Sequence, residues 1–317
     1  MSNSSSCLQP FLQQQGFLVL DGGLASELEF LGLDLNDPLW STKVLLEQPE
    51  AITRVHQSYL EAGADIITTA SYQTSYPGLR KRGLSKLAID QLLKESVDLA
   101  KSARDRFCQT TSNNEKPKPL VAASVGPYGA YLADGSEYTG QYGVDKAALR
   151  EFHAPRLAQL IYAEPDLLAF ETIPCLAEAE VLMELLQGFP DQPAFLSYSC
   201  RDGQHISNGE TFREAVAIAK DIPQIVAVGI NCTAPQWITP LLESVQDTNG
   251  LPFVVYPNRG ESWDAAIKCW VPGSEGAGIA AIVGGWYELG AKILGGCCRI
   301  RPADIQAIRQ QLQAILP

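Results

Sequence analysis

Hydrophobic positions along the chain gather into eight short runs, separated by longer stretches in which apolar residues recur at helical spacing. Each run has four to seven residues, is nearly apolar throughout and carries few charges. This pattern is typical of strands that are buried on both faces of a parallel sheet. The predicted strands are Gly16–Asp21, Asp65–Thr69, Leu120–Val125, Leu167–Glu171, Ala194–Ser199, Ile225–Asn231, Phe253–Pro257 and Lys292–Gly295.

The stretches between the runs predict amphipathic helices. Because eight strands that are each followed by a helix can close on themselves, we predict an α/β protein made of a single (β/α)8 TIM barrel. An open, doubly wound sheet is the alternative, but no G-x-G-x-x-G sequence follows the first run, which disfavours its dinucleotide-binding form. The predicted helices are Glu50–Ala62, Leu84–Phe107, Lys146–Ala163, Leu176–Gln187, Thr211–Lys220, Thr239–Thr248, Gly276–Leu289 and Pro302–Leu316.

The domain organisation is predicted to be simple. We expect residues 1–15 to form a disordered polar leader and residues 16–317 to form one barrel domain. The first lysine is Lys43, so the start of the chain lacks the positive charge of a secretory signal. The apolar stretch 277–297 is rich in glycine and interrupted by charges, which does not fit a membrane span. We therefore expect a cytoplasmic protein.

Composition narrows the range of partners. The 317 residues include 24 Lys and Arg against 36 Asp and Glu, which gives a formal net charge of −12. A chain without an excess of basic residues cannot neutralise many phosphates, so neither nucleic acid nor an anionic membrane is an expected partner. Eight cysteines without a secretory signal indicate a reducing compartment, where thiols act as apolar fillers, metal ligands or nucleophiles rather than as disulfides.

Three cysteines follow predicted strands, at the end of the barrel where such folds carry their chemistry. Cys232 follows the sixth run, and Cys297 and Cys298 follow the eighth run after two glycines. Adjacent cysteines form a strained disulfide, whereas Zn²⁺ prefers thiolates and keeps one position open when it has three protein ligands. The three together predict a catalytic zinc site, although a lone cysteine is more often a small buried apolar residue. The remaining cysteines lack such partners: Cys7, Cys108, Cys175, Cys200 and Cys269.

Two carboxylates are expected at the same end of the barrel. Asp21 ends the first run and Glu171 ends the fourth. A charge that follows a buried apolar strand needs a partner, and a substrate ammonium group would supply one. Asp21 could instead cap a helix over Leu24–Phe30. A glycosidase pair is a further alternative, but it would leave three thiols unexplained. The histidines lie away from the strand ends and are not expected to be catalytic: His56, His153 and His205.

The chain resembles the homocysteine S-methyltransferase family, in the branch that uses S-methylmethionine or S-adenosylmethionine as methyl donor. The resemblance extends from about Phe17 to Ile308, with the motifs in family order. The combination of GINC with GGCC is highly specific, and SVGPYGA with DGSEY separates this branch from the betaine-using one less decisively. The motifs are LDGGLASELE, TTASYQTS, SVGPYGAYLADGSEYTG, FETIP, GINCTAP, VYPNRGE and GGCCR.

This resemblance implies a (β/α)8 barrel with one zinc per chain, held by Cys232, Cys297 and Cys298. It also implies that L-homocysteine binds with help from Asp21 and Glu171. Tyr72 matches a family position near the metal and would occupy the open coordination site when substrate is absent. The full set of expected substrate contacts is Asp21, Glu171, Thr69, Ser71, Tyr72 and Asn231.

The expected reaction is methyl transfer from a sulfonium donor to L-homocysteine, which gives methionine. A zinc-bound thiol is a thiolate, and a sulfonium leaves as a neutral sulfide, so neither a general base nor a general acid is required. Trp40, Tyr128 or Tyr138 could attract the sulfonium through a cation–π contact. Arg259, where a small residue is expected, could grip a substrate carboxylate or repel a cationic donor.

Three alternatives remain open at this point. The zinc site could serve another methyl donor such as betaine. A barrel aldolase or phosphosugar isomerase could bind phosphate at Gly295 and Gly296, but it would want a lysine at the end of a strand, and Lys292 begins one. The third alternative is a non-catalytic protein that binds zinc or senses thiols.

Overall fold

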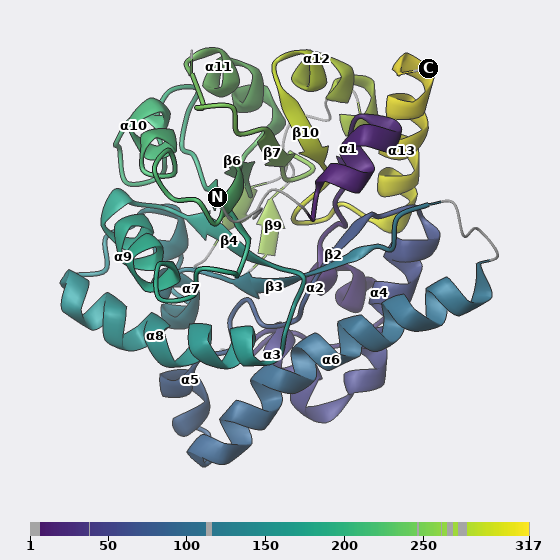
Figure 1. Cartoon of the computed structure of the whole chain (residues 1–317). Helices are drawn as coiled ribbons and strands as arrows, with labels where there is room; N and C mark the ends of the chain where they lie inside the picture. The colour runs from purple at the N-terminus through teal and green to yellow at the C-terminus, as the bar shows by residue number, and fades with distance from the viewer. Residues whose placement is uncertain are drawn as a thin grey trace.

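Eight parallel strands form the central sheet of the computed structural model, which describes residues 7–37, 39–111, 116–245, 247–260, 262–264, 269–271 and 278–316. Their order in the sheet is β1-β10-β7-β6-β5-β4-β3-β2. Leu20, directly after β1, forms a parallel bridge with Ile66 of β2, so the sheet closes into a barrel (Figure 1). The strands are β1 Leu18–Val19, β2 Ile66–Thr68, β3 Leu120–Val125, β4 Leu167–Ile173, β5 Ala194–Tyr198, β6 Ile225–Asn231, β7 Phe253–Tyr256 and β10 Ala291–Leu294.

All eight predicted strands are therefore confirmed, and so is the closed barrel. The helices that connect them surround the barrel, as Figure 1 shows. Residues 276 and 277, where one predicted helix was expected to begin, lie outside the described residues. The connecting helices are α4 Pro49–Glu61, α6 Lys86–Thr110, α8 Lys146–Tyr162, α9 Leu176–Leu186, α10 Phe212–Ala217, α11 Ile238–Glu243, α12 Val283–Glu288 and α13 Pro302–Ile315.

Shorter elements lie in the loops between the strands and these helices. Three of them lie in loops that follow strands and contribute to the candidate site: α2 (Leu24–Phe30), α3 (Ser41–Glu47) and the 3-10 turn η2 (Ser136–Tyr138). The others are α5 Tyr76–Arg80, α7 Tyr128–Leu132, η3 Pro235–Trp237, η4 Ile279–Ala281 and the antiparallel pair β8 Ser262–Asp264 and β9 Cys269–Val271.

The strands separate two apolar cores, which explains why the runs are apolar at every position. Along β3, Leu120 and Ala122 belong to the core inside the barrel. Val121, Ala123 and Val125 belong to the core between the barrel and its helices. Successive strand residues point to opposite faces, so a strand with a core on each side must be apolar throughout.

The start of the chain differs from the prediction of a disordered leader. Residues Gln9–Gln15 form helix α1, with a proline in its first turn and Gly16 at its end in the left-handed conformation (φ 78°). Phe11, together with Leu8 just before the helix, joins the core inside the barrel. Apolar groups that pack onto a core order the backbone that carries them, which explains why this segment is helical and not disordered. Helix α1 covers the end of the barrel where the strands begin.

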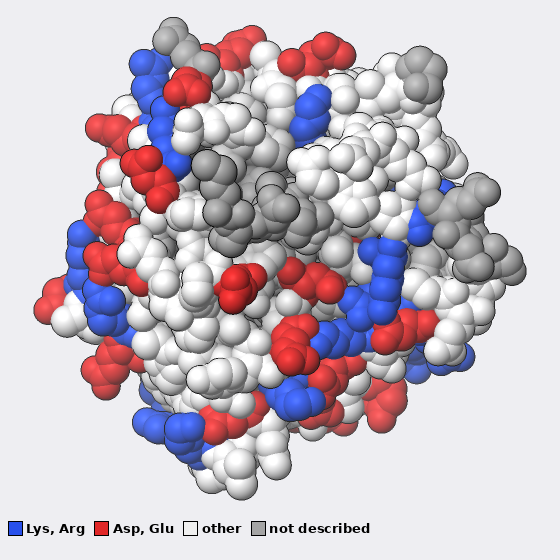
Figure 2. Space-filling view, viewed as in Figure 1, with Lys and Arg blue, Asp and Glu red and all other residues white. Residues whose placement is uncertain are grey.

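Charged side chains are distributed over the outer surface with both signs mixed. On the face shown in Figure 2, Lys and Arg lie beside Asp and Glu around the outer helices. Between α8 and α9, for example, Lys146 pairs with Glu180 and Arg150 pairs with Glu184. No helix in the described part of the chain is long and apolar enough to cross a membrane.

Candidate functional site

A cavity of about 610 Å³ lies at the carboxyl ends of the strands. This is the end at which (β/α) barrels place their active sites. One part of its wall comes from residues that end or follow strands, including the expected Asp21, Thr69, Glu171, Cys232, Cys297 and Cys298. The other part comes from α2, the segment before α3, and the turn η2.

The three predicted ligand cysteines lie together in this cavity. Their Sγ atoms are all within 4.8 Å of one another. Cys232 Sγ and Cys297 Sγ are joined as a disulfide, whereas Cys298 Sγ lies 3.9 Å from that of Cys232 and 4.0 Å from that of Cys297. The sequence predicted free thiols here. The cysteines that meet are the predicted ones, but the same sulfurs can form either a cross-link or a set of metal ligands.

Two glycines before the cysteines allow this close packing. A Cβ atom on Gly295 would come within 2.6 Å of the Leu20 carbonyl oxygen, and one on Gly296 within 2.1 Å of the Ile300 side chain. Neither contact is sterically possible, so the chain after β10 approaches the end of β1 only because Gly295 lacks a side chain, and it folds back onto Ile300 only because Gly296 lacks one.

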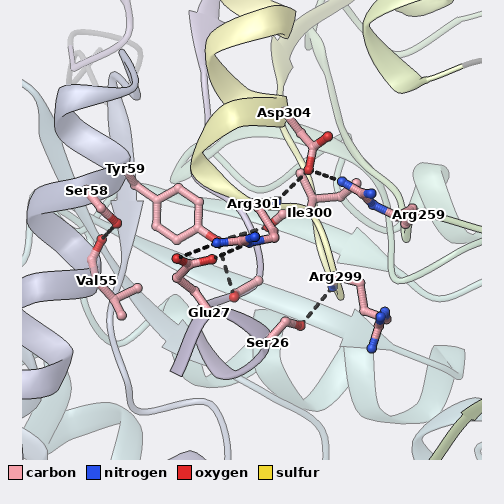
Figure 3. A network of polar contacts seen from close by, with 11 residues as sticks. Ser26, Glu27, Val55, Ser58, Tyr59, Arg259, Arg299, Ile300, Arg301 and Asp304 are labelled. Atoms are coloured by element: carbon pink, nitrogen blue, oxygen red, sulfur yellow. Dashed lines mark hydrogen bonds and ion pairs between the residues drawn. The ribbon is translucent and has the colours of Figure 1, made fainter. Parts of the chain in front are cut away.

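The loop that follows the cysteines is anchored on three helices (Figure 3). Arg301 donates to both carboxylate oxygens of Glu27 in α2, at 2.9 and 3.3 Å. The Tyr59 hydroxyl of α4 donates to the Ile300 carbonyl at 2.9 Å. Asp304, in α13, accepts from the Arg301 backbone at 2.8 Å. These bonds hold the segment that carries Cys297 and Cys298 in one position.

Arg259 belongs to this anchoring network and not to the cavity wall. Its guanidinium forms an ion pair with Asp304 (Figure 3), and it does not line the cavity. The expectation that Arg259 lies at the mouth, where it would grip or repel a substrate, is therefore corrected. The carboxylate of Asp304, in the first turn of α13, pairs with the guanidinium instead.

Asp21 and Glu171 both line the cavity, as predicted, and both are buried. Asp21 does not cap α2, whose N-cap residue is Gly23; it accepts hydrogen bonds from the Thr68 backbone N–H at 2.7 Å and from the Thr68 hydroxyl at 3.1 Å. Burial raises the pKa of Asp21 well above its usual value, and the nearby charge of Glu171 raises it further.

Glu171 accepts hydrogen bonds from two hydroxyl groups. Ser124 donates to its Oε1 atom, and Tyr256 donates to its Oε2 atom at 3.2 Å. Burial raises the pKa of Glu171 to about 7. Two neighbouring carboxylates with raised pKa values would both be stabilised in their charged form by a cation. The pair is suited to receive an ammonium group.

Tyr72 and Thr69 also line the cavity. The Tyr72 ring packs closely against the chain at Gly126, where a Cβ atom would lie 2.6 Å from the ring. It also meets the Trp40 ring at an interplanar angle of 69°, with ring centroids 6.2 Å apart. The glycine of the SVGPYGA motif therefore makes room for the tyrosine of the TTASYQTS motif.

Ser71 and Asn231, which were also expected to contact substrate, do not line the cavity. Ser71 donates to the Ser124 carbonyl at 2.7 Å. Asn231 Oδ1 accepts from the Thr172 N–H at 2.7 Å, and its Nδ2 donates to the Thr172 hydroxyl at 2.8 Å. Thr172 has a positive φ of 59°. The amide thus stabilises a strained backbone next to Glu171.

Two of the three aromatic residues considered for binding the sulfonium line the cavity. Trp40 and Tyr138 line the cavity. Tyr128 packs instead against other aromatic rings, 5.0 Å from the centroid of Phe152. No histidine lies on the cavity wall in the part of the chain that the structure describes. His56, for example, is buried in α4, and burial lowers its pKa to about 4.

Glu137 is an acidic residue of the cavity that the sequence analysis did not identify as part of the site. Glu137, in η2, lines the cavity, and its Oε2 atom is buried without a hydrogen-bond partner. Burial raises the pKa of Glu137 to about 7. The residue lies in the DGSEY motif, which marked the resemblance but had no assigned role. It follows no strand directly, so a search of strand ends could not find it.

Comparison with known proteins agrees with this geometry. The model of the family described as homocysteine S-methyltransferase matches residues 18–312. The chain is 46% identical over 302 residues to homocysteine S-methyltransferase YbgG of Bacillus subtilis, covering 95% of this chain and 96% of the relative. It is also 46% identical over 303 residues to the homocysteine S-methyltransferase of Escherichia coli, covering 95% and 97%.

Solved structures show the same fold. The crystal structure of the metallated form of the homocysteine methyltransferase MmuM from Escherichia coli matches with a TM-score of 0.86 and 42% identity, covering 96% of this chain and 99% of that one. The oxidized form of the same protein matches with a TM-score of 0.86 and 42% identity, covering 98% and 100%.

Proposed function

This chain belongs to the homocysteine S-methyltransferase family, and we propose that it transfers a methyl group from a sulfonium donor to L-homocysteine with one zinc ion on Cys232, Cys297 and Cys298. The donor would be S-methylmethionine or S-adenosylmethionine, and the product methionine. We assign this activity to residues 16–317 as one catalytic domain in the reducing cytoplasm, which keeps the three cysteines as thiols.

The observation that carries the proposal is the cluster of three sulfur atoms beside two buried carboxylates in one cavity. Two ligand sulfurs on one tetrahedral zinc lie about 3.8 Å apart, given a Zn–S distance of about 2.3 Å. The Sγ atom of Cys298 lies 3.9 and 4.0 Å from the other two. In their reduced form the three cysteines therefore fit a soft divalent cation.

The metal explains how thiol chemistry can occur in a buried site. Burial raises the pKa of the Cys298 thiol to about 12, which is unfavourable for a thiolate. Bound zinc would supply the positive charge that holds sulfur as thiolate at neutral pH, both in the ligands and in the incoming substrate thiol.

The residues of the chain then bind and align the two substrates. Asp21 and Glu171 would bind the ammonium group of homocysteine. Its sulfur attacks the donor methyl carbon as the bond from that carbon to the sulfonium sulfur breaks, and the electron pair of the broken bond stays on the donor. The homocysteine thiol gives up its proton to solvent when its sulfur binds as thiolate, so in the transfer itself a neutral sulfide leaves and no proton moves. The faces of Trp40, Tyr72 and Tyr138 would attract the sulfonium.

A methyl-transfer assay with zinc analysis tests this function. Reduced protein with about one zinc per chain is expected to form methionine from homocysteine with S-methylmethionine or S-adenosylmethionine. Methionine formation with betaine alone would move the donor assignment to the betaine alternative. Zinc binding without turnover of any donor would favour the non-catalytic, thiol-binding alternative.

A further inference from the structure

Glu137 combines two features that no other described residue shares. Several buried side-chain atoms lack a hydrogen-bond partner, and of the residues that carry them only Glu137 also lines the cavity at the strand ends. Burying a carboxylate oxygen without a hydrogen-bond partner is unfavourable relative to leaving it in water. Such a group inside a ligand cavity indicates that the ligand supplies the missing partner.

The backbone of Glu137 is held in place on two sides. A Cβ atom on Gly129 would lie 2.3 Å from the Glu137 nitrogen, so α7 approaches the turn as closely as a glycine allows. On the other side, the Ser199 hydroxyl donates to the Glu137 carbonyl at 3.1 Å. The carboxylate is therefore presented to the cavity by a fixed turn and not by a mobile loop.

Glu137 lies on a different part of the cavity wall from the Asp21–Glu171 pair. Hydroxyl and backbone groups donate hydrogen bonds to Asp21 and Glu171, whereas Glu137 lies in η2 and its Oε2 atom has no hydrogen-bond partner. The cavity thus has one carboxylate pair and, on η2, a second acidic group. Two amino-acid substrates would bring two ammonium groups.

We propose that Glu137 binds the α-ammonium group of the methyl donor and thereby selects sulfonium donors that are amino acids. The proposal rests on the proposed function, in which Asp21 and Glu171 already serve the ammonium group of homocysteine. With the sulfonium against the aromatic rings and the ammonium at Glu137, the donor is held at two points. Two points of attachment align its methyl group with the acceptor sulfur.

The test compares Glu137→Gln with the wild type at saturating homocysteine. Loss of one charge-assisted hydrogen bond is expected to lower kcat/KM for S-methylmethionine roughly 10- to 150-fold. KM for homocysteine and the zinc content should stay unchanged. Dimethylsulfoniopropionate carries the sulfonium but no ammonium group, so its inhibition constant against S-methylmethionine should change less than about twofold.

Glu29→Gln is the matched control, because Glu29 also lines the cavity but is exposed. An equal loss in Glu29→Gln would mean that only the negative potential of the cavity matters, which would overturn the proposal.

Glu137→Asp, which keeps the charge on a shorter side chain, should show a smaller loss of kcat/KM. This variant replaces Glu137→Gln in the test if the Gln variant is insoluble. Unchanged kcat/KM for S-methylmethionine in an active Glu137 variant would refute the role of Glu137 and leave the proposed function intact. Absence of methyl transfer in the wild type would refute the proposed function itself.

Discussion

At the scale of single residues, the chemistry of this cavity depends on which state its three sulfur atoms adopt. A disulfide between Cys232 and Cys297 removes two ligands, whereas reduction leaves three thiols within 4.8 Å of one another. Since the disulfide and the metal site compete for the same atoms, zinc binding should require reduced protein.

Under reducing conditions Cys232→Ala is expected to lose most of the zinc, because two sulfur ligands bind the ion much less tightly than three. Cys200→Ala is the control: Cys200 is buried to a similar degree but does not belong to the cluster. It should retain about one zinc per chain by metal analysis. Full zinc occupancy in Cys232→Ala would remove this residue from the ligand set.

Glu171→Gln tests whether the carboxylate binds substrate or takes part in the chemical step. The variant keeps the shape and loses the charge, so kcat/KM for homocysteine should fall roughly 10- to 150-fold with zinc retained. The same measurement with 4-mercaptobutyrate, which lacks the amino group, should show a much smaller loss. Equal loss for both thiols at full zinc occupancy would contradict ammonium binding and place Glu171 in the reaction.

Glu137 should make stability depend on pH. Burial raises its pKa in the folded protein from the ordinary 4.5 to about 7, so the folded state binds this proton more tightly than the unfolded state. Its contribution to stability is therefore fully present below about pH 4.5 and is lost as pH rises through 7.

Glu137→Gln removes the loss of stability at high pH, because glutamine does not ionise. We expect the variant to be more stable than the wild type at pH 8 by up to roughly 3 kcal/mol, with a much smaller difference at pH 5. Urea unfolding at both pH values, at equal zinc content, measures it. A difference that does not change with pH would show that the carboxylate is not the cause.

At the scale of elements, the segment after β10 is positioned by close backbone contacts and by bonds to α2, α4 and α13. Gly296→Ala would place a Cβ atom 2.1 Å from the Ile300 side chain. The segment must shift, at a cost of about 1–3 kcal/mol, and the two cysteines that follow shift with it. We expect weaker zinc binding together with lower stability.

Gly285→Ala provides the comparison for this change. Gly285 lies within α12, and a Cβ atom there would meet nothing within 4 Å. Since alanine favours a helix more than glycine does, stability should rise by about 0.5–1 kcal/mol with zinc binding unchanged. Calorimetric titration with zinc and thermal unfolding distinguish the two variants, and equal zinc affinity in both would argue against a tightly fitted segment.

At the scale of the whole molecule, the two ends of the barrel have different tasks. The cavity and its sulfur atoms lie at the carboxyl ends of the strands, whereas α1 covers the opposite end. Asp65, directly before β2, holds α1 against the rest of the molecule: it accepts from Gln15 of α1 at 2.9 Å and pairs with Arg309 of α13. The first end of the barrel serves chemistry, and the second serves stability.

Phe11→Ala tests this division. Phe11 is 2% exposed, so its truncation is expected to lower the free energy of unfolding by about 3–5 kcal/mol. Methyl transfer at a temperature where the variant is folded should keep the wild-type kcat/KM. Gln13→Ala, on the exposed side of α1, should change stability by less than about 0.5 kcal/mol. A large loss of kcat/KM in folded Phe11→Ala would mean that the two ends are coupled.

The sequence by itself determined the strands, the barrel and the cysteines that meet. A strand with a core on each side is apolar at every position, which is a local property and can be read from eight runs. Parallel strands that end at one face bring their last residues together, so the positions of Asp21, Glu171 and Cys232 follow from the strand count. The expectation of zinc and of the two substrates came from the motifs that resemble the family.

Only the tertiary structure decided which polar groups are free to meet a ligand. Asn231 ends β6 and Ser71 follows β2, yet partners on nearby strands satisfy them. Arg259 pairs with Asp304, 45 positions further along the chain. Leu8 and Phe11 become buried because the barrel they cover is built from the rest of the chain. A side chain's partners come from distant residues, and short-range patterns carry no information about them.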